Sequence, residues 1–484
     1  MDIKTCAAAV ACLVTVSCTM ESFDAVYDNI GMPEYAEGAG DRFSEIKENE
    51  FIKTSDNNQS TFSIDADGAA YAYMRRNVTA GGLPSANSVR IEEYLNYFTF
   101  NYPEPENGQA AAINGEFGPC PWNPAHRLLR LGIKGRSLEE DDVPLSNYVF
   151  LVDVSGSMYP DDKLGLLKKG LTSLVDNLRP DDRVSIVTYS GSAERILEST
   201  PVSEAERIKN AISKLTAGGS TAGGAAMKMA YEEALSNYIE GGNNRVVMGT
   251  DGDFNVGVTS TDALLEMAED YASKGIYLTV CGFGTGNLND SMMETVSGKG
   301  NGTYEYIDCE EEMVKVFVNE VSKFHSVAND AKVQVTFDKE RVDSYRLIGY
   351  ENRLLSNEDF ENDRKDAGEI GAGQTITALY EIIPGKAFED GGDAAVFDFR
   401  YKESLGASSI PLTLKIKPSS GISDEFYFAA GVAAYGLVLF DSKYKGAATF
   451  DMAYELSGSG LGFDPYHYRE QFRSLVLAAR KISQ

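Results

Sequence analysis

The fold prediction depends on ten residues, Tyr148-Val149-Phe150-Leu151-Val152-Asp153-Val154-Ser155-Gly156-Ser157. The first five are apolar or aromatic, a run too short for a helix and typical of a buried central strand in a parallel sheet. The strand then ends in the carboxylate of Asp153 and the hydroxyls of Ser155 and Ser157. Such oxygen atoms at the carboxyl end of a buried strand lie where open α/β sheets bind ligands. Oxygen ligands without His or Cys suit Mg²⁺, Mn²⁺ or Ca²⁺ and do not suit zinc.

Strand and helix patterns alternate on both sides of this motif, from residue 146 to about residue 326. Lys163–Leu178 carries leucine and valine along one helical face, and Val184–Tyr189 has the apolar character of a second strand. This alternation predicts a doubly wound parallel sheet in a domain spanning residues 146–326. Further helices are expected at Glu204–Leu215, Gly224–Leu235, Asp262–Ala272, Asp290–Val296 and Glu310–Phe324, and further strands at Arg245–Gly249, Ile276–Cys281 and Thr303–Ile307.

Two later segments bring more oxygen atoms to the same edge. The loop Gly218-Gly219-Ser220-Thr221 precedes a helix and offers a hydroxyl, and the buried strand Val246–Gly249 leads to Asp251. In a doubly wound sheet these loops emerge on one edge, so we expect five oxygen-bearing residues to converge on one divalent cation. These residues are Asp153, Ser155, Ser157, Thr221 and Asp251.

The composition of this set suits a cation that keeps a free position. Two carboxylates nearly neutralise a divalent ion, while three hydroxyls fill positions without adding charge. Where a carboxylate binds through water, the ion stays electrophilic and can accept one more ligand.

The order Asp-x-Ser-x-Ser, then Thr, then Asp after a later strand resembles the von Willebrand factor type A (VWA) family and its metal-ion-dependent adhesion site. All five positions match. The resemblance implies that the domain binds Mg²⁺, or else Mn²⁺ or Ca²⁺, and that an Asp or Glu of a protein partner completes the coordination.

Longer matches resemble bacterial VWA lipoproteins of the YfbK type over nearly the whole mature chain. They are Thr61–Asp65, Val89–Glu93, Cys120–Pro124, Arg183–Tyr189, Thr250–Gly257 and Tyr345–Asn352. The terminal helices resemble the C-terminal domain of that family, to which no activity is assigned.

The first eighteen residues have the pattern of a lipoprotein signal peptide, with an apolar stretch from Ala7 to Val16 before Cys18. The end of this segment resembles a bacterial lipobox, which implies lipidation of Cys18 and anchorage in a membrane. Thr15 departs from the leucine that is usual three residues before the cysteine. Cleavage without lipid, and lipidation at Cys12, are the alternatives.

Residues 19–59 are acidic and polar, so we expect a linker there, with a short helix near Phe43–Phe51. Residues 60–145 form a mixed N-terminal region. It should contain helices at Ala69–Arg76 and Val89–Phe98 and a strand at Arg127–Ile133.

After residue 326 the apolar period changes to two, as at Val333, Val335 and Phe337, which predicts a β-sandwich region over residues 327–420. Residues 421–484 return to helical patterning and end in a helix at Tyr468–Ile482. Both flanking regions adjoin the ends of the VWA domain, so we expect them to pack into one unit. The apolar run from Phe426 to Phe440 is shorter than the 20 or so residues of a membrane span and indicates a buried helix.

The composition excludes some partners. The net charge of -29 argues against nucleic acid, because contacts to phosphate require Lys and Arg. Cys120, Cys281 and Cys309 are too few to form a disulfide framework in a chain of 484 residues. Cys281 has the pattern of a core residue, with a Cys281–Cys309 bridge as the alternative.

Two other motifs resemble known sites but lack a residue that those sites require. A phosphoaspartate enzyme needs a second acid where this chain has Ser155. Asp251–Asn255 mimics the start of an EF-hand loop, but Val256 replaces the required glycine, so Asp253 and Asn255 should shape the loop or support the metal from outside.

Three further features are weaker still. Gly282–Gly286 lacks the third glycine of a dinucleotide loop and indicates a rim loop beside the metal face. The histidines, His126, His325 and His467, are too dispersed for a zinc or Ser-His site. Asp65 and Asp67 could bind an ion, but Asp67 is more simply the N-cap of the next helix.

These features predict a non-enzymatic binding protein, anchored by lipid in the bacterial cell envelope, with its VWA domain presented to a protein partner. Two alternatives stay open. The protein could be a scaffold in which the metal only stabilises the loop edge. It could also be a metal-dependent hydrolase, which a His, Lys or isolated Glu close to the metal would favour.

Overall fold

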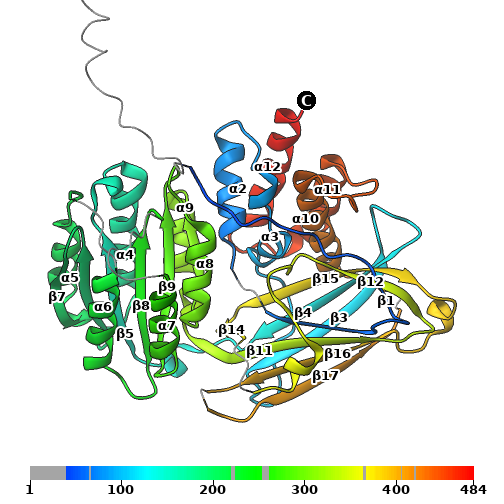
Figure 1. Cartoon of the computed structure of the whole chain (residues 1–484), viewed down its shortest axis with the longest axis horizontal. Coiled ribbons are helices and arrows are strands. Elements are labelled where there is room, and N and C mark those ends of the chain that lie inside the picture. Colours follow the sequence, from blue (N-terminus) through cyan, green and yellow to red (C-terminus); the bar gives the residue numbers. More distant parts are fainter. Residues whose placement is uncertain are drawn as a thin grey trace, which may run out of the picture. The chain divides into compact units, whose positions relative to one another are not determined.

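Six strands form the predicted central sheet, in the order β10-β9-β8-β5-β6-β7 (Figure 1). The structure is a computed structural model that describes residues 40–64, 67–219, 224–252, 261–363, 367–404, 406–418 and 421–484. The strands are β5 (Ser146–Asp153), β6 (Arg183–Tyr189), β7 (Ala193–Pro201), β8 (Asn243–Thr250), β9 (Ile276–Phe283) and β10 (Tyr304–Ile307). All neighbours pair in parallel except β7, which runs antiparallel to β6.

Helices cover both faces of this sheet, so the predicted doubly wound fold is confirmed (Figure 1). Alternate residues of β5 point to opposite faces: Phe150 belongs to one hydrophobic core and Val149 to the other. The first core contains α4 (Leu166–Asn177), α5 (Ala205–Ser213) and α9 (Glu310–Val314), and the second contains α6 (Gly224–Ser236), α7 (Thr261–Ala272) and α8 (Asp290–Lys299).

Two details of this domain differ from the sequence prediction. The edge strand β7 was not predicted, because only two of its residues, Leu197 and Thr200, are buried and the rest are half-buried or exposed. The expected helix Glu310–Phe324 is divided into α9, a π-helical turn η6 (Lys315–Asn319) and a 3₁₀ turn η7 (Val321–Phe324).

The β-sandwich contains strands from both flanks of the VWA domain. One sheet has the order β1-β12-β15-β4-β3 and the other β13-β2-β11-β16-β17, with β14 (Gly368–Gly371) beside β11. The strands before the VWA domain are β1 (Ile52–Lys53), β2 (Gln59–Ser63), β3 (Ala111–Pro119) and β4 (Arg127–Gly135). Those after it are β11 (Ser326–Phe337), β12 (Val342–Ile348), β13 (Leu354–Leu355), β15 (Thr375–Pro384), β16 (Ala395–Lys402) and β17 (Ile410–Ile416). The predicted sandwich therefore exists, and the N-terminal region supplies part of both sheets.

Helices from the two flanks also share one hydrophobic core. They are α2 (Ala69–Thr79) and α3 (Ile91–Asn96) from the N-terminal side and α10 (Asp424–Phe440), α11 (Phe450–Ser457) and α12 (Tyr468–Ile482) from the C-terminal side. The expectation that the flanking regions pack together is met. Most of α10 is buried in this core, and among the described residues no helix has the length and apolar character needed to cross a membrane.

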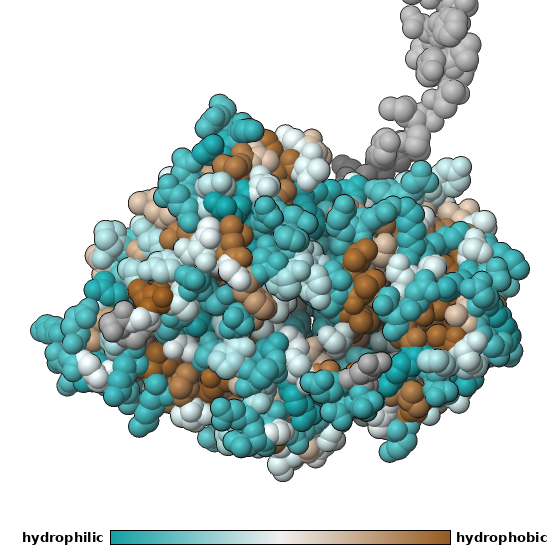
Figure 2. All heavy atoms as spheres, turned by 180° about the vertical axis from the view of Figure 1, so that it is seen from behind, coloured by the Kyte–Doolittle hydropathy of each residue, from teal (hydrophilic) through white to brown (hydrophobic). Residues whose placement is uncertain are grey.

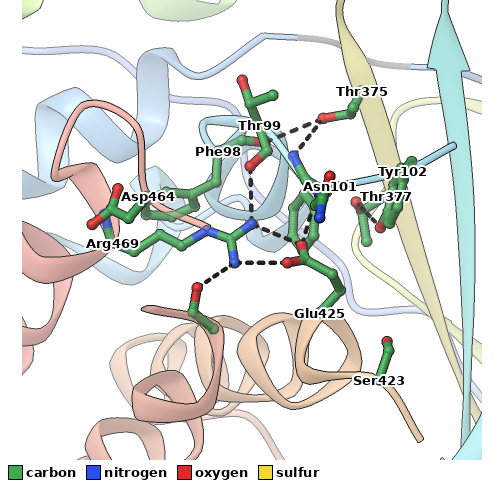
Figure 3. Close-up of polar contacts among 12 residues, drawn as sticks. Phe98, Thr99, Asn101, Tyr102, Thr375, Thr377, Ser423, Glu425, Asp464 and Arg469 are labelled. Atoms are coloured by element: carbon green, nitrogen blue, oxygen red, sulfur yellow. Dashed lines mark hydrogen bonds and ion pairs between the residues drawn. The ribbon is translucent and has the colours of Figure 1, made fainter. Parts of the chain in front are cut away.

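Arg469 of α12 holds this helical group together (Figure 3). Its guanidinium donates to both carboxylate oxygens of Glu425 on α10, at 3.1 and 2.7 Å, and to the carbonyl oxygens of Thr99 and Gly460. It also lies 4.2 Å from the ring centroid of Phe428. A bidentate, fully paired Arg of this kind fixes the relative position of the segments that it joins.

Residues 41–59 of the predicted linker belong to the folded body. Arg42 forms a parallel bridge with Asn289, and the Thr54 hydroxyl donates to the carbonyl of Val342 at 2.6 Å. The short helix expected at Phe43–Phe51 was wrong, because this segment forms neither a helix nor a strand. Its polar groups bond to other elements, as when the Asn49 amide donates to Gly349, and not to a helical turn of their own. Cys18 lies outside the described residues.

Figure 2 shows one face of the molecule, on which hydrophobic residues form separate groups within a mainly hydrophilic surface. Such scattered apolar residues are normal on a soluble surface and need no partner.

Candidate metal centre

The carboxyl ends of β5 and β8 bring Asp153 and Asp251 to one edge of the central sheet. Val152 pairs with Gly249 in register, so the next residues of both strands are neighbours. The hydroxyl of Thr250 donates to Asp153 Oδ2 at 3.3 Å. Both carboxylates are fully buried. The two strand ends therefore meet as the sequence pattern requires.

The loop after β5 folds back over Asp153. The amide of Ser155 donates to Asp153 Oδ1 at 2.8 Å, and the Ser155 and Ser157 hydroxyls lie 2.9 Å apart. A buried carboxylate and two adjacent hydroxyls thus share one small region at the sheet edge.

The third predicted loop reaches the same region through its glycines. The amide of Gly218 donates to Val154 at 2.8 Å, and the amide of Gly156 donates to the Gly219 carbonyl at 3.1 Å. Gly219 has a φ of +84°, a left-handed conformation that favours glycine. Thr221, two residues further on, lies outside the described residues, as do Asp253 and Asn255.

We call Asp153, Ser155, Ser157 and Asp251 the metal edge. Within the described ranges no three His, Cys, Asp or Glu side chains form a cluster, so a cation here would depend on hydroxyls as well as the two carboxylates.

The two carboxylates of the metal edge are buried close together, which disfavours negative charge on both. Burial raises the pKa of the Asp153 carboxyl to about 6, and the nearby Asp251 carboxylate acts in the same direction. Hydrogen bonds from Ser155 oppose this rise. A cation would relieve the repulsion between the two carboxylates.

Asp251 provides the test of whether a metal fits. Its Oδ1 atom is buried and has no hydrogen-bond partner among the described residues. Leaving a buried charged oxygen without a partner is costly, so such atoms call for an ion or a water. The oxygen-only composition of the edge fits a hard divalent cation.

Lys163 is a member of this site that the sequence analysis missed. Its Nζ atom lies 2.8 Å from Asp251 Oδ2, and both side chains are buried. Lys163 belongs to a π-helical turn, η4 (Asp161–Gly165), just before α4. A lysine at the N-terminal end of a helix opposes the helix dipole, but this alone does not indicate which carboxylate it contacts.

The glycine-rich segment at the end of β9 forms the rim loop that was predicted. The Gly284 carbonyl accepts from the Tyr306 hydroxyl at 2.7 Å, and Asp41 accepts from the amides of Gly286 and Leu288. Cys281, beneath this loop, is buried and carries a free thiol, as do Cys120 and Cys309. The alternative of a Cys281–Cys309 bridge is therefore wrong.

Asp67 does not cap α2, contrary to prediction. Its carboxylate accepts from the amide of Tyr304 at 3.1 Å, and the first turn of α2 is instead capped by Glu93, which accepts from the amide of Ala70 at 2.7 Å. Both contacts join separate elements, and only the folded structure reveals them. Asp65 lies outside the described residues.

Tyr159 projects beside the metal edge. It follows Ser157 by two residues and is 82% exposed. The other described rim loops, at residues 190–192, 217–219 and 284–287, contain only small or polar residues. A partner that approached the edge would therefore meet hydroxyls, backbone and one aromatic ring.

This sheet, with carboxylates and hydroxyls at the carboxyl end of β5 and β8, defines a VWA domain. The model of the von Willebrand factor type A domain matches residues 147–320, and a further model described as von Willebrand factor matches residues 37–130. The model described as "Uncharacterized protein YfbK, C-terminal" matches residues 322–482. The chain belongs to the YfbK family of VWA proteins.

One relative extends this likeness over most of the molecule. The Escherichia coli protein named "Uncharacterized protein YfbK" is 35% identical over 468 residues, which cover 91% of this chain and 81% of that protein. An uncharacterized Synechocystis protein, sll0103, is 26% identical over 40% of this chain and 45% of its own. A solved von Willebrand factor type A protein from Catenulispora acidiphila aligns over 78% of this chain and 98% of its own, with 17% identity and a TM-score of 0.44. VWA domains typically mediate protein–protein interaction and adhesion.

Proposed function

We propose that this chain is a lipid-anchored envelope protein whose VWA domain holds a Mg²⁺-type ion, or Mn²⁺ or Ca²⁺, and captures a carboxylate of a protein partner. Five residues would hold the ion: Asp153, Ser155, Ser157, Thr221 and Asp251. When bound, the ion supplies positive charge at an edge that is otherwise negative, and so attracts an Asp or Glu of the partner.

The unpartnered, buried Oδ1 atom of Asp251 is the observation that carries this proposal. The chain's own residues arrange the site before a partner binds. The Ser155 amide and the Thr250 hydroxyl hold Asp153 in place, and the Ser155–Ser157 pair presents hydroxyl oxygens beside it. The partner binds the ion through one acidic side chain. Tyr159 adds an aromatic contact next to the edge.

Lys163 is the kind of residue that would favour a hydrolase, since it lies at the metal edge. Its ammonium group, however, donates to Asp251 at 2.8 Å. Because Nζ is already held in this buried contact with Asp251, it is not free to act as the general base that hydrolysis needs. Binding therefore remains the function that the site supports best.

The metal site is tested with Asp153→Ala, which leaves the Lys163–Asp251 pair intact. We expect wild-type protein to be stabilised by Mg²⁺, by about 2.7 kcal/mol at a concentration 100 times its Kd, and the variant to lose this stabilisation. Asp161→Ala, an exposed change on the same rim, is the control and should behave as wild type. An unchanged Mg²⁺-dependent melting shift in Asp153→Ala would reject the site.

Partner capture is tested by crosslinking in the envelope with and without chelator. The proposal requires a crosslinked partner that chelator releases from wild type and that Asp153→Ala never retains. A partner retained equally in all four samples would indicate a scaffold instead.

The anchor is tested with Cys18→Ser. This change should abolish labelling by a radioactive fatty acid and release the protein from the membrane fraction, whereas Cys12→Ser should do neither. Labelling that persists in Cys18→Ser would refute the anchor at this position.

A further inference from the structure

The buried ammonium of Lys163 competes with a metal for the same carboxylate. Nζ of Lys163 lies 2.8 Å from Asp251 Oδ2, with side-chain exposures of 9% for Lys163 and 0% for Asp251. This is a solvent-excluded ion pair, in which electrostatic interactions are much stronger than at the surface. One oxygen of Asp251 is thus already paired with a cation of the protein itself, while Oδ1 is not.

The surrounding backbone is shaped to admit this lysine. Gly284 has a φ of +70°, and a methyl group in place of its hydrogen would overlap the Lys163 side chain at Cε. The Gly284 carbonyl is held by the hydroxyl of Tyr306. The π-helical turn Asp161–Gly165 sets the lysine's starting point, and such turns are frequently found at functional sites. The π-helical turn Asp161–Gly165 and the loop at Gly284 therefore leave room for the Lys163 side chain to reach Asp251.

The charge balance has a direct consequence for metal affinity. Asp153 and Asp251 offer two negative charges to a divalent ion, and Lys163 cancels one of them before the ion arrives. The described structure gives Asp153 no ion pair, so the cancellation falls on Asp251 alone. In a buried site this lowers the attraction for a second cation and at the same time stabilises the metal-free protein.

We infer that Lys163 is a tethered cation that sets the metal affinity of this site, by neutralising Asp251 when no metal is bound and opposing the metal when it is. The inference rests on the proposed metal site. The site then stays folded without metal and takes up the ion only when its free concentration is high enough to overcome Lys163.

The test measures metal affinity directly, with Mn²⁺ by electron paramagnetic resonance and Mg²⁺ by calorimetry. Lys163→Met keeps the length of the side chain and removes the charge, so we expect Kd to fall at least tenfold, about 1.4 kcal/mol. The melting temperature without metal should fall, because Asp251 loses its partner. Lys163→Arg keeps the charge and should bind metal as weakly as wild type. Lys169→Met, at an exposed position of α4 whose ion pair with Glu310 lies at the surface, is the matched control.

The outcomes separate this inference from the proposed function. Tighter binding in Lys163→Met supports the inference, even if wild type binds no metal at the concentrations used. Equal or weaker metal binding in Lys163→Met, with a lower melting temperature, would make Lys163 a structural partner only and overturn it. Absence of binding in both proteins would overturn the inference and the proposed metal site together.

Discussion

Two buried carboxylates and one buried ammonium group lie at the same end of the central sheet, and this imbalance of charge gives the edge its chemistry. Asp153 and Asp251 follow directly from the sequence, because each comes at the end of an apolar strand. Lys163 could not be predicted in the same way. It belongs to a helical pattern like many others, and only the folded loop directs it toward Asp251.

His325 is a partly buried group whose charge affects stability. It lies at the join between the VWA domain and β11, its Nδ1 atom has no hydrogen-bond partner among the described residues, and burial, with Arg245 nearby, lowers its pKa to about 4. The unfolded chain has the ordinary value of 6.5, so it binds the proton first as the pH falls. The stability from neutral His325 is therefore present above pH 6.5 and is lost progressively between about pH 6.5 and pH 4.

We predict that the His325→Gln variant loses less unfolding free energy than the wild type as the pH falls. Between pH 7 and pH 4 the wild type should lose about 2 to 3 kcal/mol more unfolding free energy than the variant, because glutamine cannot be charged. Urea unfolding at a series of pH values measures the difference, which cancels the contributions of other titrating groups. Parallel curves for the two proteins would contradict the prediction.

Among the elements, some strands could be predicted from the sequence and others could not. The strands β5 and β8 are continuous apolar runs, so their type and position were predictable. β3 and β7 were not, since the mixed residues of the mostly half-buried β3 and of the edge strand β7 lack the period-two pattern. The pairing of β2 and β4 with strands more than 200 residues away was also beyond prediction, because nothing in a local pattern specifies a distant neighbour.

Among the described rim loops, Tyr159 is the large exposed side chain, and we predict that it contributes to partner capture. Tyr159→Ala should weaken chelator-sensitive capture at least tenfold, since exposed tyrosines beside an anchoring contact are frequent hot spots. Metal affinity and melting temperature should stay unchanged, because the ring is 82% exposed. Tyr238→Ala, which changes a partly exposed tyrosine at the amino end of the sheet, is the matched control. Full capture by Tyr159→Ala would remove this residue from the interface.

In the whole molecule, buried ion pairs join the VWA domain to its flanking body. Arg90, at the start of α3, contacts Glu93 at 2.9 Å and, on α8 of the VWA domain, Asp290 at 2.6 Å and Glu294 at 3.1 Å. Arg75 of α2 contacts Asp308 and Glu312 in the same manner. These contacts cross the boundaries that composition places between segments, and charged residues in a sequence give no sign of which partner they will meet.

We predict that Arg90→Ala destabilises the protein by about 3 to 5 kcal/mol, because it removes the ion pair of two buried carboxylates, Glu93 and Asp290, while Glu294 keeps its contact with Arg353. Calorimetry should show a lower melting temperature and a separate transition for the VWA domain. Arg207→Ala serves as the control, since its pairs with Glu198 and Glu204 are exposed to solvent and should contribute little to stability. A loss no larger than that of the control would show that Arg90 does not hold the two parts together.

The interleaved sandwich also dictates an order of assembly. β2 and β4 precede the VWA domain and pair with β11 and β15, which follow it. During synthesis the early strands must wait with unpaired edges until some 200 further residues have emerged, while the VWA sheet can close on its own. Newly made chains are therefore most open to aggregation and to chaperones late in translation, after the VWA domain is already complete.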